Sequence, residues 1–120
     1  TRSDRDWSSD VCSSDLLLSA NPRPTAVFAY SDLLACNLIR TLEGHGFHVP
    51  QDFSVVGFDD LEYARMFRPA LSTIAQPKKD LGRLAAQNLI EMIKGHEVTD
   101  LILQPQLVIR ETSAPLSKRK

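Results

Sequence analysis

The chain has 120 residues and a mass of 13.4 kDa, which leaves room for one domain with a modest core. It carries 14 Lys and Arg against 15 Asp and Glu, so its net charge of −1 gives no electrostatic case for binding nucleic acid or acidic lipid. Two cysteines, Cys12 and Cys36, do not suggest a disulfide framework, and no apolar run has the length of a membrane span, so we expect a reduced, cytoplasmic setting.

The first sixteen residues differ in composition from the rest. Nine of them are Ser or Asp, and neither a helical nor a strand period runs through Thr1–Leu16. The stretch DWSSDVCSSDL, residues 6–16, matches the in-frame translation of a sequencing-library adapter, and RSDR before it fits the adapter end. We therefore expect residues 1–16 to be an adapter-derived or disordered leader without stable packing, so that Trp7 and Cys12 carry no functional meaning.

From residue 17 the pattern is that of a compact α/β domain over 17–113, followed by a flexible basic tail over 114–120. Apolar residues from Thr25 to Ser31 predict a buried strand, which leads directly into a helix over Asp32–Glu43. Further elements are predicted at residues 53–58 (strand), 61–67 (short helix), 71–76 (strand), 78–94 (helix), 101–104 and 106–111 (two short strands). This order predicts a parallel sheet with helical crossovers.

Polar residues follow the first two predicted strands directly: Ser31 and Asp32 after one, Asp59 and Asp60 after the other. Open α/β sheets bind ligands beyond the carboxyl ends of their strands. Three interpretations are open. These residues can cap the helices that follow, they can hold a magnesium ion in an acid pocket, or Asp59 can accept hydrogen bonds from hydroxyls or amines of a ligand.

Other chemistry finds little support in the sequence. The acid pocket lacks a lysine or nucleophile at a third strand end, and the histidines, His45, His48 and His96, have no carboxylate or cysteine that completes a metal-ligand set. No serine sits in a nucleophile elbow, and the glycines form no phosphate loop. We therefore predict no enzyme activity, no cofactor and no metal site.

Four motifs together carry a family resemblance. They are RPTAVFAYSDLLA, HVPQDFSVVGFDDLEYA, PALSTIAQPKKDLGRLAAQNLI and LQPQLVIRETS, in this order from about residue 23 to residue 113. The set resembles the carboxyl-terminal part of the LacI/GalR family of bacterial transcription regulators. Any one of the motifs alone is weak evidence, but the combination is specific.

The resemblance implies a fold like that of periplasmic sugar-binding proteins of type I, with two α/β lobes around a ligand cleft. It assigns residues 24–72 and 107–111 to one lobe, and residues 78–94 and 101–103 to the other. We therefore expect an incomplete domain, and a helix over 78–94 whose apolar stripe has lost most of its cover. The DNA-binding head of the family is expected to be missing, so DNA would be bound only through that head.

The resemblance also carries roles to particular residues. Asp59, the first Asp of GFDD, is the position that usually binds ligand hydroxyls or a purine. Ser31 stands where the family commonly has Asn, with a shorter reach and a single hydroxyl. Cys36, Arg40 and Phe67 fall on the helices that form the family's dimer face.

The leading hypothesis is the ligand-sensing part of a LacI-type regulator, which binds a sugar or nucleoside-like effector and forms a homodimer in the intact protein. The alternative is a fragment of a periplasmic sugar-binding transport protein, which shares the fold and the GFD motif. The runs VPQDFSVVGFDD and STIAQPKKDLGRLAA favour the regulator.

Overall fold

The structure is a computed structural model that describes residues 9–116, with side chains described from residue 14. From residue 26 onward its helices and strands follow one another in the predicted order, except that one predicted strand is absent, and a helix that was not predicted precedes them. The elements are α1 (Ser9–Ser19), β1 (Ala26–Phe28), α2 (Asp32–Gly44), β2 (Ser54–Phe58), α3 (Glu62–Met66), β3 (Ser72–Ala75), α4 (Lys78–Ile93) and β4 (Gln106–Val108). The prediction of an α/β fold is confirmed.

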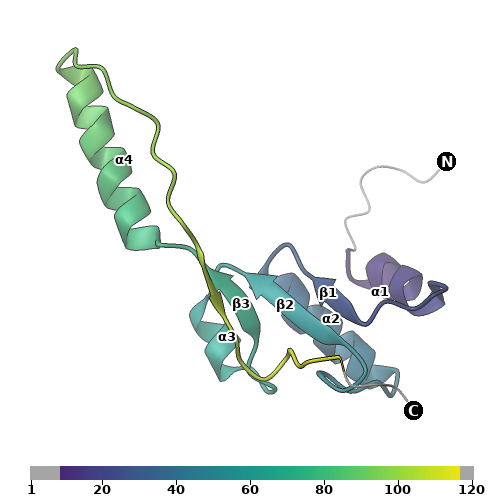
Figure 1. Cartoon of the computed structure of the whole chain (residues 1–120). Coiled ribbons are helices and arrows are strands. Elements are labelled where there is room, and N and C mark those ends of the chain that lie inside the picture. Colours follow the sequence, from purple (N-terminus) through teal and green to yellow (C-terminus); the bar gives the residue numbers. More distant parts are fainter. Residues whose placement is uncertain (1–8, 117–120) are drawn as a thin grey trace, which may run out of the picture.

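The four strands form one sheet in the order β1-β2-β3-β4 (Figure 1). β1 pairs in parallel with β2, and β2 in parallel with β3, with Phe28 opposite Val56 and Phe58 opposite Ile74. β4 pairs antiparallel with β3, with Leu107 opposite Ile74, so the sheet is mostly and not wholly parallel. The parallel pairing brings the carboxyl ends of β1, β2 and β3 to one edge.

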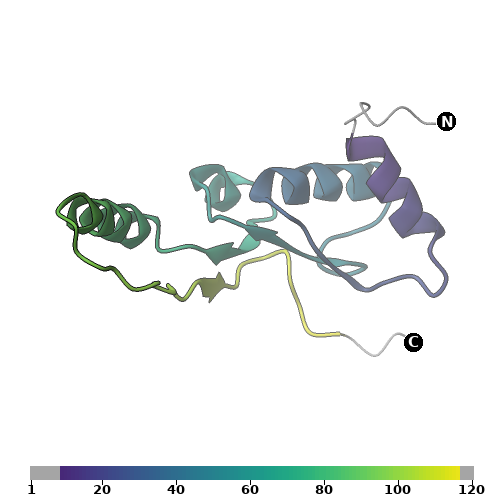
Figure 2. The ribbon, with the colours of Figure 1, turned by 90° about the horizontal axis from the view of Figure 1, so that it is seen from above.

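The core lies between this sheet and the helices on one of its faces. Seen from above, α1, α2 and α3 lie on the same side of the strands (Figure 2). Alternation along β2 turns Val55 and Gly57 toward these helices, and the apolar period of α2 turns Ala35, Ile39 and Leu42 toward the sheet. These residues are the centre of a cluster of ten buried apolar residues: Ala29, Ala35, Cys36, Ile39, Leu42, Val49, Phe53, Val55, Ala64 and Leu71.

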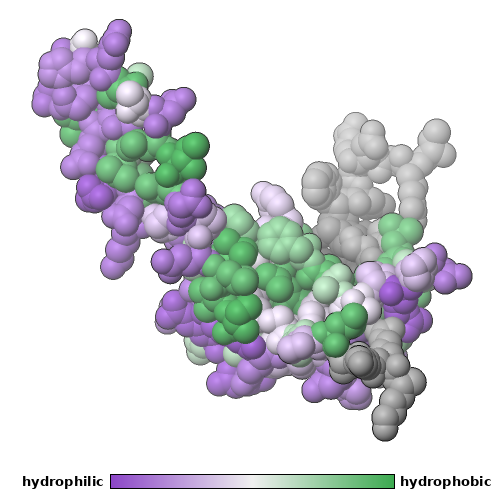
Figure 3. Space-filling model, in the orientation of Figure 1, coloured by the Kyte–Doolittle hydropathy of each residue, from purple (hydrophilic) through white to green (hydrophobic). Residues whose placement is uncertain are grey.

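The other face of the sheet carries apolar side chains without a helical layer. Figure 3 shows a hydrophobic surface over the strands in the view that has α2 behind the sheet. Phe28 and Leu107 point from this face and are 63% and 58% exposed. Phe28 meets Phe58 edge-on, with ring centroids 6.3 Å apart. Parallel sheets are normally covered on both faces, whereas here the described helices cover one face only.

α4 stands away from the sheet as an arm, and the chain returns beside it toward β4 (Figure 1). No residue of α4 is buried, and Leu81, Leu89 and Met92 of its predicted apolar stripe are 51%, 58% and 58% exposed. The radius of gyration is 18.8 Å, where a compact chain of this length has about 14 Å. The apolar stripe of α4 is therefore not covered by other described residues, as the sequence predicts.

One predicted strand is absent. Residues 101–104 form neither helix nor strand, and Leu101 and Ile102 are 53% and 86% exposed. A strand needs a neighbour that accepts and donates its backbone hydrogen bonds, and among the described residues no strand pairs with this segment. The prediction of a strand here is wrong because an apolar run alone does not supply a partner.

The leader differs from expectation in its local structure. Ser9–Ser19 form α1, although no helical period was found there; Ser14 is 2% exposed and Leu17 and Leu18 pack on the core cluster. Residues 1–8, with Trp7, lie outside the described residues, as do 117–120 of the predicted basic tail. The adapter origin of residues 2–16 stays a prediction.

None of the helices over residues 9–116 has the length and apolar character needed to cross a bilayer.

Gly57 offers a test of how tightly the sheet meets α2. A Cβ atom added there would lie 2.4 Å from Oδ1 of Asp32 and 2.9 Å from Cδ2 of Leu71. Both neighbours are fully buried and cannot withdraw. We expect Gly57→Ala to lower the free energy of unfolding by about 1–3 kcal/mol, the usual cost of overpacking, as measured by urea titration of the chain.

The matched control is Gly44→Ala at the end of α2, where an added Cβ has no atom within 4 Å. This change should leave stability the same or raise it by up to about 1 kcal/mol, because alanine restricts the unfolded chain. Equal midpoints for Gly57→Ala and the parent chain would contradict the packing described here.

Candidate functional site

The four polar residues that follow β1 and β2 lie at one edge of the sheet. Ser31 and Asp32 begin α2, while Asp59 and Asp60 form the turn between β2 and α3. Because β1 and β2 are parallel and adjacent, both pairs come to the carboxyl edge, where open sheets bind ligands. Their surroundings differ, and these differences decide what each residue can do.

Ser31 is a helix cap. Its backbone is extended, with φ −147°, and its Oγ accepts a hydrogen bond from the backbone N–H of Leu34 at 3.3 Å. This satisfies one of the four N–H groups that the first turn of α2 leaves without an intrahelical partner. The capping interpretation, considered for the Ser and Asp residues at this edge, therefore holds for Ser31.

Asp32 is fully buried and holds three elements together. Its Oδ1 accepts from Oγ1 of Thr73 on β3 at 2.5 Å, and its Oδ2 accepts from the backbone N–H of Leu61 at 2.8 Å, just before α3. A buried carboxylate is costly unless donors reach it, and here each oxygen has one. Asp32 is therefore a structural residue and no part of a ligand surface.

Asp60 is paired with two arginines. Its Oδ1 accepts from Nη2 of Arg110 at 2.6 Å and its Oδ2 from Nη2 of Arg65 at 3.0 Å, and its side chain is 9% exposed. Burial raises the pKa of Asp60, but the hydrogen bonds and charges of Arg65 and Arg110 outweigh it, so the pKa lies below its ordinary value. Both oxygens are occupied by the protein itself.

Asp59 has the most open carboxylate at this edge. Its Oδ1 accepts from Nε2 of Gln76 at 2.6 Å, and its backbone carbonyl accepts from the ammonium of Lys78. The side chain lines an open hollow of about 320 Å³ between the carboxyl edge and the base of α4. The hollow is lined by Asp59, Asp60, Arg65, Ala75, Gln76, Pro77, Lys78, Lys79 and Asp80. In the described part of the chain, Oδ2 of Asp59 has no hydrogen-bond donor.

A second hollow adjoins the first. It has about 150 Å³ and shares Gln76 and Pro77 with the hollow beside Asp59. Its other lining residues are mainly apolar: Phe58, Leu81, Leu101, Leu103 and Pro105. The carboxylate therefore stands next to an apolar wall, a combination that suits a ligand with polar edges and an apolar face.

The acid-pocket interpretation finds no support in this geometry. Asp32 and Asp60 are turned to donors within the fold, and the three carboxylates do not converge on one point. Within residues 9–116, no group of three or more His, Cys, Asp and Glu side chains is placed to hold a metal ion. His45 contacts the carbonyl of Thr41, and His96 pairs with Glu91.

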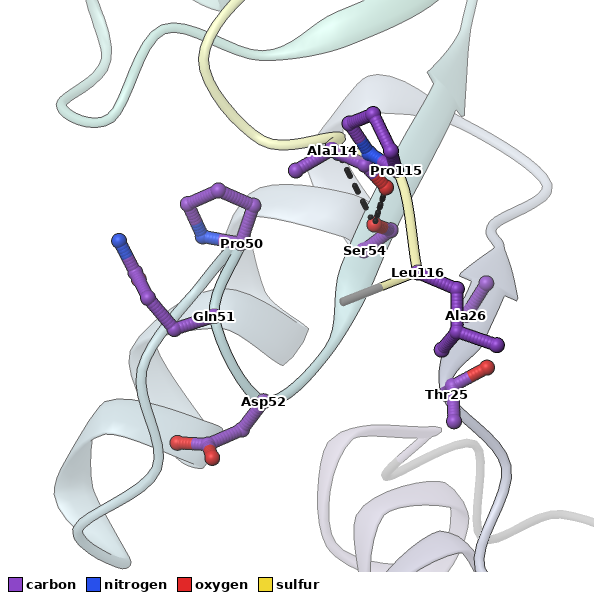
Figure 4. Close-up of a pocket in the computed structure, with 9 residues that line it drawn as sticks. All are labelled: Thr25, Ala26, Pro50, Gln51, Asp52, Ser54, Ala114, Pro115 and Leu116. Atoms are coloured by element: carbon purple, nitrogen blue, oxygen red, sulfur yellow. Dashed lines mark hydrogen bonds between the residues drawn. The ribbon is translucent and has the colours of Figure 1, made fainter. Parts of the chain in front are cut away.

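A third hollow lies at the opposite edge, beside the amino ends of β1 and β2 (Figure 4). It has about 110 Å³, and the end of the described chain covers it. Oγ of Ser54 donates to the carbonyl of Ala114 at 3.2 Å and accepts from its N–H at 3.1 Å. Its position at the amino edge makes it a poor candidate for the ligand site of a parallel sheet.

Comparison with known proteins shows the family to which the chain belongs. Residues 2–113 match the family described as the periplasmic binding protein-like domain. The ribose operon repressor of Haemophilus influenzae is 41% identical over 109 residues, and the repressor PurR of Vibrio campbellii is 40% identical over 109 residues. Each alignment covers 89% of this chain and 33% of the relative.

The chain is a LacI-type member of the periplasmic binding protein-like family.

Solved structures of LacI-type proteins superpose on most of the chain. The regulator CelR in complex with cellobiose matches with a TM-score of 0.78 and 37% identity, over 88% of this chain and 33% of that one. The lac repressor dimer bound to operator and the anti-inducer ONPF matches with a TM-score of 0.80 and 30% identity, over 89% and 38%. The predicted resemblance is confirmed, and the named relatives are transcription repressors, not enzymes.

The alignments show what share of such a regulator this chain corresponds to. This chain spans about one third of the length of the repressors that it matches. It supplies a partial periplasmic binding protein-like domain with a mostly parallel sheet, as predicted.

The three residues assigned to the LacI-type dimer face do not all lie on one surface. Arg40 of α2 stacks on the ring of Phe67, with its guanidinium 5.5 Å from the ring centroid. Both line an open hollow of about 570 Å³ between α2 and α3, together with Glu43, Tyr63, Met66 and Arg68. The structure thus brings Arg40 and Phe67 together on one surface.

The structure contradicts the placement of Cys36 on that surface. Its side chain is 6% exposed and belongs to the core cluster beneath α2. Burial, with a further contribution from the charge of Asp32, raises the pKa of the Cys36 thiol to about 11. The reason is the helical period: Cys36 lies beside Ala35 and Ile39 and shares their buried side of α2.

Several residues of this site were missed by the sequence analysis. Thr73, Gln76, Lys78 and Arg110 each donate a hydrogen bond to one of the aspartates. They stand 17 to 50 positions away from their partners, so no local pattern relates them. The available signal was their place in the family motifs, with Thr73, Gln76 and Lys78 in PALSTIAQPKK and Arg110 in LQPQLVIRETS.

The paired state of Asp60 predicts a pH dependence. A carboxyl whose pKa is lower in the folded chain stabilises it above the ordinary pKa of 3.8, and that contribution is lost as pH falls through the folded pKa. We expect Asp60→Asn to lower the free energy of unfolding by about 1.5–3 kcal/mol at neutral pH, the range for hydrogen bonds to charged groups. The difference from the parent chain should shrink below about pH 4.

Urea titrations of both chains across this pH range measure the difference. Asp80→Asn is the control, because the Asp80–Arg83 pair is more than half exposed and should contribute less than about 1 kcal/mol at any pH. A penalty for Asp60→Asn that stays constant down to pH 2.5 would show that its charge is not the stabilising feature.

Proposed function

We propose that this chain is the effector-binding part of a LacI-type transcriptional regulator, and that Asp59 binds the effector. The observation that carries the proposal is the division among the three aspartates at the carboxyl edge. Asp32 and Asp60 are occupied by donors of the fold, while Asp59 lines an open hollow with one oxygen directed to a single amide. A carboxylate so placed can accept hydrogen bonds from a ligand.

The surroundings of Asp59 indicate the class of effector. The carboxylate suits hydroxyl or N–H donors, and Gln76 can both donate and accept beside it. The adjoining apolar wall, which includes Phe58, suits the flat face of a sugar ring or a nucleobase. We therefore infer a sugar or nucleoside-like effector, which agrees with the ribose and cellobiose bound in two LacI-type structures.

Ser31 is a second candidate contact. Its hydroxyl oxygen accepts from the N–H of Leu34, and its proton can still be donated to an acceptor on the effector. The hydroxyl is shorter than the amide of the Asn that commonly stands at this position in the family. The effector is therefore expected to approach β1 closely or to leave this contact weak.

The remaining partners follow from the same proposal. DNA would be bound by a head that lies in the part of the relatives beyond this match, and such a regulator would work in the cytoplasm. The subunits would associate as a homodimer through the surface between α2 and α3, with Arg40 and Phe67 at its centre. A transport protein is the less favoured alternative, because the relatives named above are repressors.

Asp59→Asn tests the effector site. The change keeps the size of the side chain and removes its charge, so it should weaken effector binding by about 1.5–3 kcal/mol, which is roughly 10- to 150-fold in Kd. The measurement is calorimetric titration of the regulator, expressed at the full length of its repressor relatives, with D-ribose, cellobiose and inosine.

The control is Asp100→Asn, which alters an exposed carboxylate that lines neither hollow and should change Kd less than twofold. An unchanged Kd for Asp59→Asn in a folded protein would remove Asp59 from the effector site. Binding of none of the three probes would argue against the proposed class of effector.

A charge reversal tests the dimer surface. Arg40→Glu combined with Met66→Asp places two negative charges in the hollow between α2 and α3, where Met66 is 72% exposed. In a symmetric dimer each change occurs twice across the interface, so the repulsion should yield monomers in sedimentation velocity. Arg83→Glu on α4 is the control for charge, and a dimer that persists in the double variant would exclude this surface.

A further inference from the structure

The turn that carries Asp59 has an unusual backbone. Asp59 has φ 108° and Asp60 has φ 50°, and they are the two non-glycine residues with positive φ in the described chain. Side chains other than glycine are disfavoured in this region, and such residues persist where the surroundings fix them. The direction in which Asp59 leaves β2 therefore depends on whatever holds this turn.

Three backbone groups of the turn are fixed by β3 and by Asp32. The N–H of Asp59 donates to the carbonyl of Ile74 at 2.9 Å, and the N–H of Asp60 contacts Oγ1 of Thr73 at 3.4 Å. The N–H of Leu61 donates to Asp32. These bonds fix where the turn begins and ends, while the Asp60 side chain is fixed separately.

The Asp60 side chain is held by two arginines of unequal burial. Arg65 lies five residues further along the chain, and its side chain is 66% exposed. Arg110, two residues beyond the end of β4, is 15% exposed, and its second nitrogen, Nη1, donates to the carbonyl of Leu71 at 2.8 Å. A buried, doubly bonded guanidinium constrains its partner far more than an exposed one does.

We propose that Arg110 is a positioning residue for effector binding, which acts through Asp60 to hold the left-handed turn that directs Asp59 into its hollow. The inference rests on the proposed function, because it assigns Arg110 a part in the site where Asp59 binds the effector. Arg110 does not line this hollow itself. Without the Arg110 guanidinium, the Asp60 carboxylate keeps the exposed Arg65 as its ion-pair partner, and the turn can relax toward negative φ.

Calorimetry with D-ribose, cellobiose and inosine provides the first test, on the regulator at the full length of its relatives. Arg110→Gln should weaken binding of the bound probe about tenfold, and Arg83→Gln, the control at an exposed arginine that does not line the hollow, should change it less than twofold. Asp60→Asn should weaken it as Arg110→Gln does. The double variant should be no weaker than either single variant, because both remove the same contact.

Amide hydrogen exchange provides a readout that a general loss of stability would not reproduce. In Arg110→Gln, exchange at Asp60 and Leu61 should become about tenfold faster, while exchange at Val55 in the centre of β2 stays unchanged. Arg65→Gln should leave all three rates unchanged. Arg110→Lys keeps the positive charge but not the two guanidinium nitrogens that bond Asp60 and Leu71, and it should give an intermediate result. This variant replaces Arg110→Gln in the test if the Arg110→Gln protein does not fold.

The outcomes separate this inference from the proposed function. If Asp59→Asn binds as the parent does, or no probe binds, the proposed function fails, and the exchange rates still decide whether Arg110 holds the turn. If Asp59→Asn weakens binding and Arg110→Gln does not, the positioning role of Arg110 is overturned. The positioning role is also overturned if the losses of binding affinity add up in the double variant. The same holds if Arg110→Gln accelerates amide exchange equally at Asp60, Leu61 and Val55.

Discussion

The structure depends on one buried carboxylate. Asp32 begins α2, bonds Thr73 of β3 through one oxygen and fixes the backbone before α3 through the other. It also requires Gly57, because a side chain on β2 at that point would occupy the space of Oδ1. This one carboxylate thus ties α2 to β3 and to the segment before α3, and the cost of burying it is offset only while both donors stay in place.

Because Asp32 is used in this way, the neighbouring aspartates can serve other purposes. Asp60 binds Arg65 and Arg110, so its charge is compensated within the protein. Asp59, one residue earlier, accepts a hydrogen bond from the Gln76 amide and lines the hollow. Two adjacent residues of the same type therefore have different roles, because their carboxylates have different partners.

Local patterns predicted most of the fold and less of the site. The period of α2 and the apolar run of β2 depend on neighbours within a few residues, and these elements appear where they were expected. The segment 101–104 fails as a strand because its neighbours would have to come from elsewhere. The same limit applies to the site: its position at a strand end is local, but the donors that distinguish Asp32 from Asp59 come from distant strands. The apolar period placed Cys36 on a second, outward side of α2, whereas its side chain lies in the core.

The arm formed by α4 leaves the sheet at Pro77, which lines the hollow beside Asp59. The chain returns past Leu103 and Pro105, on the other side of the adjoining hollow. The two hollows therefore lie at the base of α4, about which this helix would rotate relative to the sheet. A helix of 16 residues is about 24 Å long, so a rotation of about 10° at its base moves its far end by about 4 Å. A molecule bound there would contact the base of α4, where a small rotation becomes a larger displacement of the far end.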